Sequence, residues 1–139
     1  MLAGMVALGF GWTGAQAMWA RMTDAELVAE SALIVLGRVA EMRVGEGPDT
    51  APRTVGVLAI EAVVKGAPDM VEVLIAVPQP GAPLSSTDLV IREGQDGLWV
   101  LRAIDGDGDA THAADHPQRF VPRPEAASRV EELRSLLAP

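Results

Sequence analysis

The carboxylates of Asp105, Asp107 and Asp109 have the spacing that most resembles a binding motif. Alternate aspartates open the loop of a calcium-binding EF-hand, in which oxygens at positions one, three and five coordinate the ion. The rest of the loop departs from that pattern. Position six is Ala110 instead of glycine, and position twelve is His116 instead of a bidentate glutamate. We therefore interpret the segment as a turn between strands rather than as a calcium site.

Two histidines add further potential ligands to the same segment. His112 and His116 are four residues apart, with Asp115 between them. This spacing suits zinc only if the segment is helical. Pro117 and the extended character of the neighbouring residues argue against a helix, so we assign no metal and no cofactor. A metal-dependent protein would use the carboxylates and imidazoles of this loop: Asp105, Asp107, Asp109, His112 and His116.

The remaining residues offer few groups for catalysis. The chain has no cysteine and no tyrosine, which excludes thiolate nucleophiles, thiolate metal sites and disulfides. The hydroxyls of residues 85–87 lie in a loop rich in proline, with no G-x-S-x-G elbow around them. We therefore predict that the protein is not an enzyme and assign no catalytic residues.

The charge balance excludes some partners. The chain carries 11 basic and 19 acidic residues, a formal net charge of −8, and only 4% of its residues are aromatic. Nucleic-acid-binding surfaces are basic and often stack bases on aromatic side chains. Nucleic acid and anionic membrane surfaces are therefore not expected as partners. We interpret the acidity as a contribution to solubility.

Residues 1–17 are typical of an export signal. They carry no charge, residues 2–12 form an apolar stretch, and Ala15-Gln16-Ala17 matches the small-residue rule for cleavage. The apolar stretch is too short to span a bilayer, and its glycines disfavour a buried helix. We predict an exported protein, periplasmic or secreted, that contacts a membrane only if this segment stays attached. The basic n-region is missing, since Arg21 is the first basic residue, so the true start and the cleavage remain open.

Two long apolar stretches, residues 32–44 and 53–66, predict the main strands of the domain that follows, residues 18–139. Beyond Gly37 the first stretch alternates, with Ala40, Met42 and Val44 on the expected buried face. A glycine inside a strand marks a bulge or bend, and a bent strand can pair with two neighbours when a small barrel closes.

Shorter segments complete the prediction. Residues 71–77 predict a strand, residues 89–92 and 98–104 a hairpin, and residues 116–121 a last edge strand.

Two helices are expected at the ends of this domain. A capping box predicts a short helix over residues 24–31, and Trp19 before it is expected to pack against the barrel. An amphipathic helix over residues 124–137 should cap the barrel with one apolar face, formed by Val130, Leu133, Leu136 and Leu137. The fold class is therefore mainly β: a small barrel of five to six strands with a short N-terminal helix and a C-terminal amphipathic helix.

Three motifs resemble a known family: SALIVLGRV (residues 31–39), VVKG (residues 63–66) and GLWVL (residues 97–101). They are similar to strand and turn patterns in the inhibitory domain of tissue inhibitors of metalloproteinases, the netrin-like group. The likeness spans residues 27–104 and implies an OB-like Greek-key barrel. Those inhibitors place a mature N-terminal cysteine on a catalytic zinc. Cleavage after Ala17 leaves Met18 here, and the chain has no cysteine, so zinc-chelating inhibition is not implied.

We predict a non-enzymatic exported binding module, with a protein or another envelope ligand as partner. Its interaction surfaces would be the loops over residues 45–52, 78–88 and 105–115, because loops held by a rigid barrel carry function. Two alternatives remain: a metal-dependent protein or hydrolase using the Asp105–His116 loop, and a structural envelope component that self-associates through an open edge strand. The sequence does not fix the oligomeric state.

Overall fold

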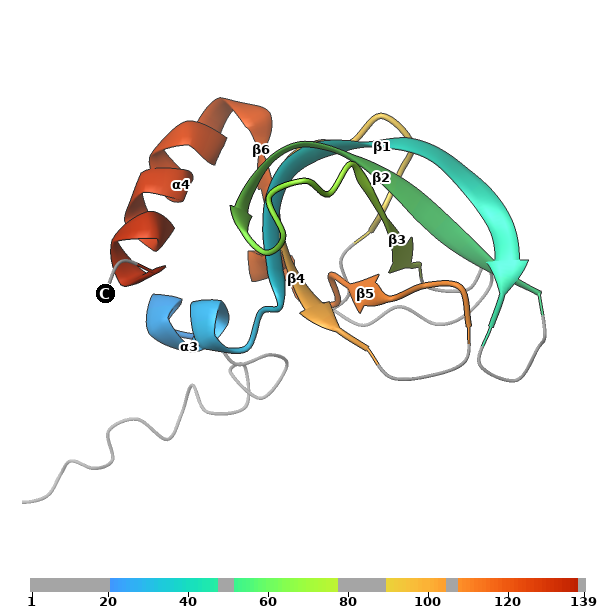
Figure 1. Cartoon of the computed structure of the whole chain (residues 1–139), viewed down its shortest axis with the longest axis horizontal. Coiled ribbons are helices and arrows are strands. Elements are labelled where there is room, and N and C mark those ends of the chain that lie inside the picture. Colours follow the sequence, from blue (N-terminus) through green and yellow to red (C-terminus); the bar gives the residue numbers. More distant parts are fainter. Residues whose placement is uncertain (1–20, 48–51, 78–89, 105–107, 138–139) are drawn as a thin grey trace, which may run out of the picture.

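The computed structural model describes residues 21–47, 52–77, 90–104 and 108–137 (Figure 1). The predicted export signal and Trp19 lie outside these residues. The elements follow one another along the chain as α3 (Asp24–Ala29), β1 (Leu33–Glu46), β2 (Pro52–Lys65), β3 (Glu72–Ala76), β4 (Asp96–Ala103), β5 (His112–Ala113), the 3-10 helix η1 (Pro117–Arg119), β6 (Phe120–Pro122) and α4 (Arg123–Leu137).

The strands close into a barrel. Their order is β1-β2-β3-β5-β4, with β4 also paired to β1, and β6 adds to β4 as a sixth strand. Each pairing is antiparallel except that of β3 with β5, which is parallel. This strand order confirms the predicted mainly β, OB-like Greek-key barrel.

The first strand bends and pairs on both sides, as its glycine predicts. Residues 33–38 pair with β4, while residues 34–46 pair with β2 except at Ala40 (Figure 1). The register with β2 shifts between Leu36 and Gly37. A Cβ on Gly37 would lie 2.4 Å from the carbonyl oxygen of Ala59, so only glycine allows β2 to approach this closely.

The predicted buried face of β1 beyond this point is confirmed for Met42, which packs against the barrel core, but it is wrong for Ala40 and Val44. A second register shift between Val39 and Glu41 leaves Ala40 without a partner on β2, which is the signature of a β-bulge. Val39 is fully buried before the bulge, Ala40 is exposed within it, and Met42 after it faces the barrel core again. Val44 is 74% exposed at the end of the strand.

The predicted hairpin before β4 is also wrong. Val90, Ile91 and Arg92 form no strand; the segment turns at Gly94 (φ +87°), and the Gln95 N–H donates to the Arg92 carbonyl at 3.2 Å. Ile91 is nevertheless buried in the barrel core. An apolar run can supply a core side chain without pairing as a strand.

The edge strand expected over residues 116–121 is shorter than predicted. Residues 117–119 form η1, and only residues 120–122 pair with β4 as β6. The two-residue strand β5, which completes the barrel, was not predicted. It is too short to show an alternating pattern.

Two cores share β4. Trp99 and Leu101 point into the barrel, whereas Leu98 and Val100 point outward against the two helices. Helices α3 and α4 lie together on one side of the barrel and cover this outer face (Figure 1). Both faces of β4 are therefore buried, which explains its continuous apolar run.

The C-terminal helix caps the barrel as predicted, with two changes in its buried face. Val130 and Leu133 are buried, and so is Ala126, which the predicted stripe did not include. Leu136 was expected in the stripe but is 44% exposed.

The Lys65-Gly66 pair closes the end of α3. The Lys65 ammonium donates hydrogen bonds to the carbonyls of Val28 at 2.9 Å and Ser31 at 2.6 Å. Carbonyls at a helix C-terminus lack partners within the helix and favour a cation. Gly66 then turns with φ +130°, where a Cβ would lie 2.5 Å from Leu33 Cδ1. The pair thus joins the short helix to the barrel.

We expect Lys65→Met to lower the free energy of unfolding by about 2 kcal/mol, because it removes two charged hydrogen bonds and keeps the aliphatic stem. Urea denaturation followed by circular dichroism measures this change. The matched control is Arg134→Met, which removes an exposed ion pair to Glu131 at 3.6 Å and should cost less than about 0.5 kcal/mol. Equal losses in the two variants would contradict a capping role for Lys65.

Candidate functional site

Three connections leave the barrel from the same end. The start of β2 pairs with the end of β3 (Val55 with Ala76), and the end of β3 pairs with the start of β5 (Ile75 with His112). The end of β4 joins them, since Ala103 pairs with His112. The connections after β1, β3 and β4 therefore begin around one end of the barrel, which we call the loop end. The sequence predicts these loops as the interaction surfaces. Their residues 48–51, 78–89 and 105–107 lie outside the described residues.

Two of these connections are hydrogen-bonded to each other. The Asp109 N–H donates to the Glu46 carbonyl at 2.7 Å, and the Glu46 N–H donates to Asp109 Oδ2 at 3.0 Å. Gly108 lies so close that a Cβ there would be 2.7 Å from the Glu46 oxygen. Asp109, a member of the predicted metal set, thus uses a carboxylate oxygen to hold the β1–β2 turn against the β4–β5 connection. Asp105 and Asp107 fall outside the described residues.

The two histidines do not have the helical spacing that a zinc pair needs. His112 lies in strand β5, with Nδ1 2.9 Å from Thr111 Oγ1. His116 precedes η1 with extended backbone, and its Nδ1 accepts the Gln118 N–H at 3.1 Å. Among residues 21–47, 52–77, 90–104 and 108–137, no three histidine, aspartate or glutamate side chains gather as a metal site requires.

Arg119 is a buried charge that the sequence pattern did not indicate. Its side chain donates to Ser31 Oγ at 2.9 Å and to the Val100 carbonyl at 3.0 Å, and only 3% of the residue is exposed. Asp115 accepts two hydrogen bonds from Arg102 and lies 3.8 Å from Arg119. Burial would raise the pKa of Asp115, but the hydrogen bond and charge of Arg102 outweigh it and hold that pKa below its usual range. This carboxylate is therefore part of a structural ion pair.

The position of His112 predicts a loss of stability on mild acidification. Burial lowers the pKa of the imidazole, so below about pH 6.5 the unfolded chain binds a proton that the folded chain does not. This contribution to stability is complete above that pH and is lost as the pH falls toward the lowered folded pKa. Urea midpoints measured at about pH 7.5 and pH 5.5 should differ for the wild type and differ less for His112→Gln. The depressed carboxylate pKa values of Asp24, Asp96 and Asp115 act at lower pH. Identical pH dependence in the two proteins would contradict the assignment.

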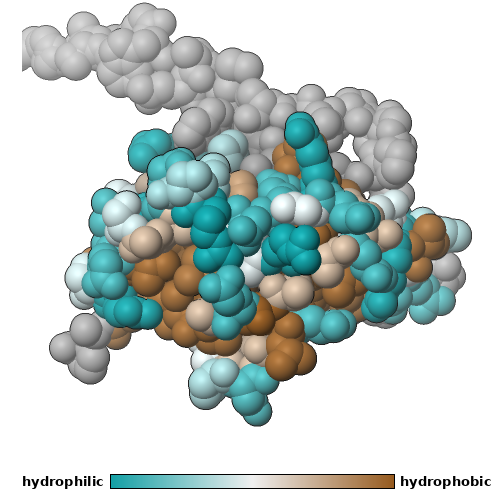
Figure 2. All heavy atoms as spheres, turned by 90° about the horizontal axis from the view of Figure 1, so that it is seen from above, coloured by the Kyte–Doolittle hydropathy of each residue, from teal (hydrophilic) through white to brown (hydrophobic). Residues whose placement is uncertain are grey.

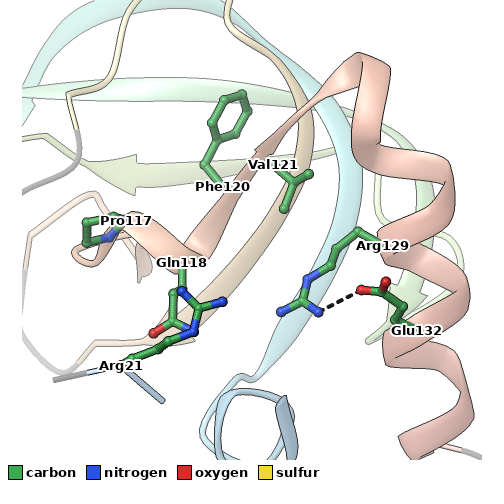
Figure 3. A pocket seen from close by; sticks show the side chains of 7 residues that line it. All are labelled: Arg21, Pro117, Gln118, Phe120, Val121, Arg129 and Glu132. Atoms are coloured by element: carbon green, nitrogen blue, oxygen red, sulfur yellow. Dashed lines mark hydrogen bonds and ion pairs between the residues drawn. The ribbon is translucent and has the colours of Figure 1, made fainter. Parts of the chain in front are cut away.

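A groove with a volume of about 420 Å³ lies on the helix side of the barrel, away from the loop end (Figure 3). It runs between β6, α4 and the chain that leads into α3, and its lining residues are Arg21, Pro117, Gln118, Phe120, Val121, Arg129 and Glu132.

The polar walls of the groove are fixed. Arg129 donates to Asp24 at 2.8 and 2.9 Å and to Glu132 at 2.9 Å, and the bonds to Asp24 hold the first residue of α3 against α4. These hydrogen bonds raise the pKa of Arg129 and lower that of Asp24. The groove is thus a preformed surface with both apolar and charged parts.

The surface also exposes several large apolar side chains. Figure 2 shows hydrophilic residues over much of the visible face, with apolar residues gathered in a band between them. The large apolar residues with the highest exposure in the described part of the chain are Val44, Val71, Val90 and Leu136. No helix among the described residues has the length and apolar character to cross a membrane.

The chain was compared with family models, with curated proteins and with solved structures, and none of the three comparisons gave a match.

Proposed function

We propose that this protein is a non-enzymatic exported binding module that engages a protein partner of the cell envelope or exterior through its loop end. The observation that carries the proposal is the pair of hydrogen bonds between Asp109 and Glu46. They join connections that are far apart in the sequence into one surface. A rigid barrel that presents joined loops at one end is a common arrangement for binding sites.

Export and family membership belong to the same proposal. Residues 1–17 support export through their composition and the Ala15-Gln16-Ala17 sequence. The barrel's strand order and the structural roles of Gly37, Lys65 and Gly66 support a relation to the netrin-like domains. Fold alone does not assign a partner, so the partner's chemistry must come from the loop end itself.

The loop end favours a basic partner. Residues 45–52, 78–88 and 105–111 contain no lysine and no arginine. Their acidic residues are Glu46, Asp49, Asp88, Asp105, Asp107 and Asp109. Such a one-sided distribution attracts a partner with a positive surface and gives an association that weakens as salt screens the charges.

Affinity capture tests this proposal. The full chain, tagged at the C-terminus, is used to capture partners from its native envelope, and bound proteins are identified by mass spectrometry. Replacing residues 78–88 with a short Gly-Ser linker, or combining Asp105→Asn with Asp107→Asn, should deplete the specific partner. The matched control combines Glu125→Gln with Glu131→Gln on α4, which removes the same charge away from the loop end and should leave capture intact.

Other outcomes would favour the alternatives. Equal capture by the loop-end variants and the α4 control would contradict the proposed surface. A hydrolytic turnover that His116→Ala abolishes would favour a metal-dependent enzyme. A defined oligomer of the purified chain, with no captured partner, would favour a structural envelope component.

A further inference from the structure

The groove on the helix side lies directly beside the point where the described chain begins. Arg21 is the first described residue, and its side chain lines the groove (Figure 3). In Figure 3, Arg21 and Gln118 lie beside each other on one side of the groove, and Arg129, joined to Glu132, lies on the other. Whatever precedes Arg21 in the chain must therefore start at the rim of this groove.

The chain is held firmly at this rim. The Gln118 side chain accepts the Met22 N–H through Oε1 at 2.7 Å and donates through Nε2 to the Met22 carbonyl at 2.9 Å. The two bonds reproduce the pairing of a neighbouring strand and fix the backbone of Met22 against η1. The capping box of α3 holds the next residue, because the Thr23 N–H donates to Glu26 Oε1 at 2.9 Å. These contacts limit the positions that residues just before Arg21 can reach.

Trp19 is two residues before Arg21, and a fully extended chain advances at most about 3.6 Å per residue. Its Cα therefore stays within about 7 Å of the Cα of Arg21, well within reach of the groove. We propose that the groove between β6 and α4 is the docking site for Trp19 of the same chain. In this proposal the N-terminal segment packs where the barrel meets its two helices.

The chemistry of the groove suits an indole ring. The side chain of Val121, which belongs to the apolar cluster on the helix side, and the ring of Pro117 give the groove apolar atoms. Phe120 also lines the groove, but its ring packs on Trp99 on the barrel side, with ring centroids 4.5 Å apart and an interplanar angle of 47°. An indole ring in the groove would cover the Val121 and Pro117 side chains and remove apolar surface from water.

The charged walls complete the match. The guanidinium groups of Arg21 and Arg129 can lie over an indole face, the most favourable partner for a cation–π contact. The indole N–H needs an acceptor when buried, and the carboxylate of Glu132 is on the groove wall. A volume of about 420 Å³ is within the range of pockets that hold small ligands, so a single side chain fits without displacing the walls.

Nuclear magnetic resonance of the full chain carrying Trp12→Phe tests the proposal directly. This variant leaves Trp19 and Trp99 as its two indoles, and Trp99 is fully buried with its N–H donated to the Gly37 carbonyl at 3.1 Å. We expect nuclear Overhauser effects from the Trp19 indole to the Val121 methyls and the Pro117 ring protons. Acrylamide quenching of Trp19 fluorescence should be several-fold weaker than that of a free tryptophan peptide.

A pair of glutamine variants separates docking from nonspecific burial of the N-terminal segment. Gln118→Ala removes the bonds to Met22 and should increase the quenching of Trp19. The matched control is Gln95→Ala, in the turn before β4. It removes a comparable side-chain hydrogen bond, in which Gln95 Oε1 accepts the Arg92 N–H at 2.9 Å. This variant should leave Trp19 protected from quenching. Absence of the Overhauser effects, with Trp19 quenched like a free peptide, would overturn the proposal. So would protection that is equal in both glutamine variants.

Discussion

Trp99→Ala is expected to lower the free energy of unfolding by about 4 kcal/mol, the largest single effect among the core side chains. Trp99 is fully buried in β4, and its ring packs against Phe120 of β6. Truncation leaves a cavity in the barrel core and removes the indole N–H from the Gly37 carbonyl. Small domains are stabilised by only about 5–15 kcal/mol, so this loss is a large fraction of the total.

Trp99→Phe separates packing from hydrogen bonding. It keeps an aromatic ring in the core but leaves the Gly37 carbonyl without the indole donor, and we expect a loss of about 1–2 kcal/mol. Chemical denaturation followed by far-ultraviolet circular dichroism measures both variants without relying on the deleted fluorophore. A cost below about 1 kcal/mol for Trp99→Ala would show that the core repacks around the missing ring.

The two long strands could be predicted because their apolar residues, and the glycines that mark a bend and an end, are visible in short stretches of the sequence. Residues 32–44 and 53–66 contain the apolar runs, and Gly37 and Gly66 stand at the bend and at the stop. In the structure, Gly37 is needed because the Ala59 carbonyl approaches it closely, and Gly66 is needed because its φ is positive. The role of Lys65 in capping α3, by contrast, joins residues 37 and 34 positions apart in the chain and is no local signal. Features set by a few neighbouring residues can be inferred from one sequence.

The faces of the strands were harder to predict because bulges are decided by pairing. The register of β1 with β2 shifts at three points, and the shift after Val39 leaves two residues, Ala40 and Glu41, between the inward-facing Val39 and Met42. Nothing in the local pattern of residues 39–44 distinguishes a bulged strand from a regular one. Alternation correctly placed Met42 on the buried face, but it placed Ala40 and Val44 there too, and both are exposed.

Strand β5 and the role of Asp109 were missed for a related reason. His112 and Ala113 pair with β3 and β4, and Asp109 bonds to Glu46, 63 residues away along the chain. The aspartates of this segment suggested a metal loop because their spacing is a local signal. The hydrogen bonds that use Asp109 depend on the closure of the barrel, which a single sequence does not show.

Gly97→Ala is the second variant with a large expected effect, and it tests the closure of the barrel. Gly97 pairs with Gly37 across β1 and β4 and with Pro122 across β4 and β6. A Cβ on Gly97 would lie 2.0 Å from the Val121 carbonyl oxygen and 3.0 Å from Phe120 Cε1. The first of these neighbours is backbone held in the sheet, so it cannot rotate away as a side chain would.

The alanine methyl must therefore push β6 away from β4, and we expect a loss of about 3 kcal/mol, at the upper end of the usual cost of overpacking. Gly94→Ala is the matched control, because Gly94 has a positive φ of 87° and no atom within 4 Å of an added Cβ. It carries only the cost of a left-handed conformation, about 1–2 kcal/mol. Urea denaturation should rank Gly97→Ala below Gly94→Ala in stability. The reverse order would mean that β6 moves freely, and α4 would then be joined to the barrel by its own apolar face rather than through the β4–β6 pair.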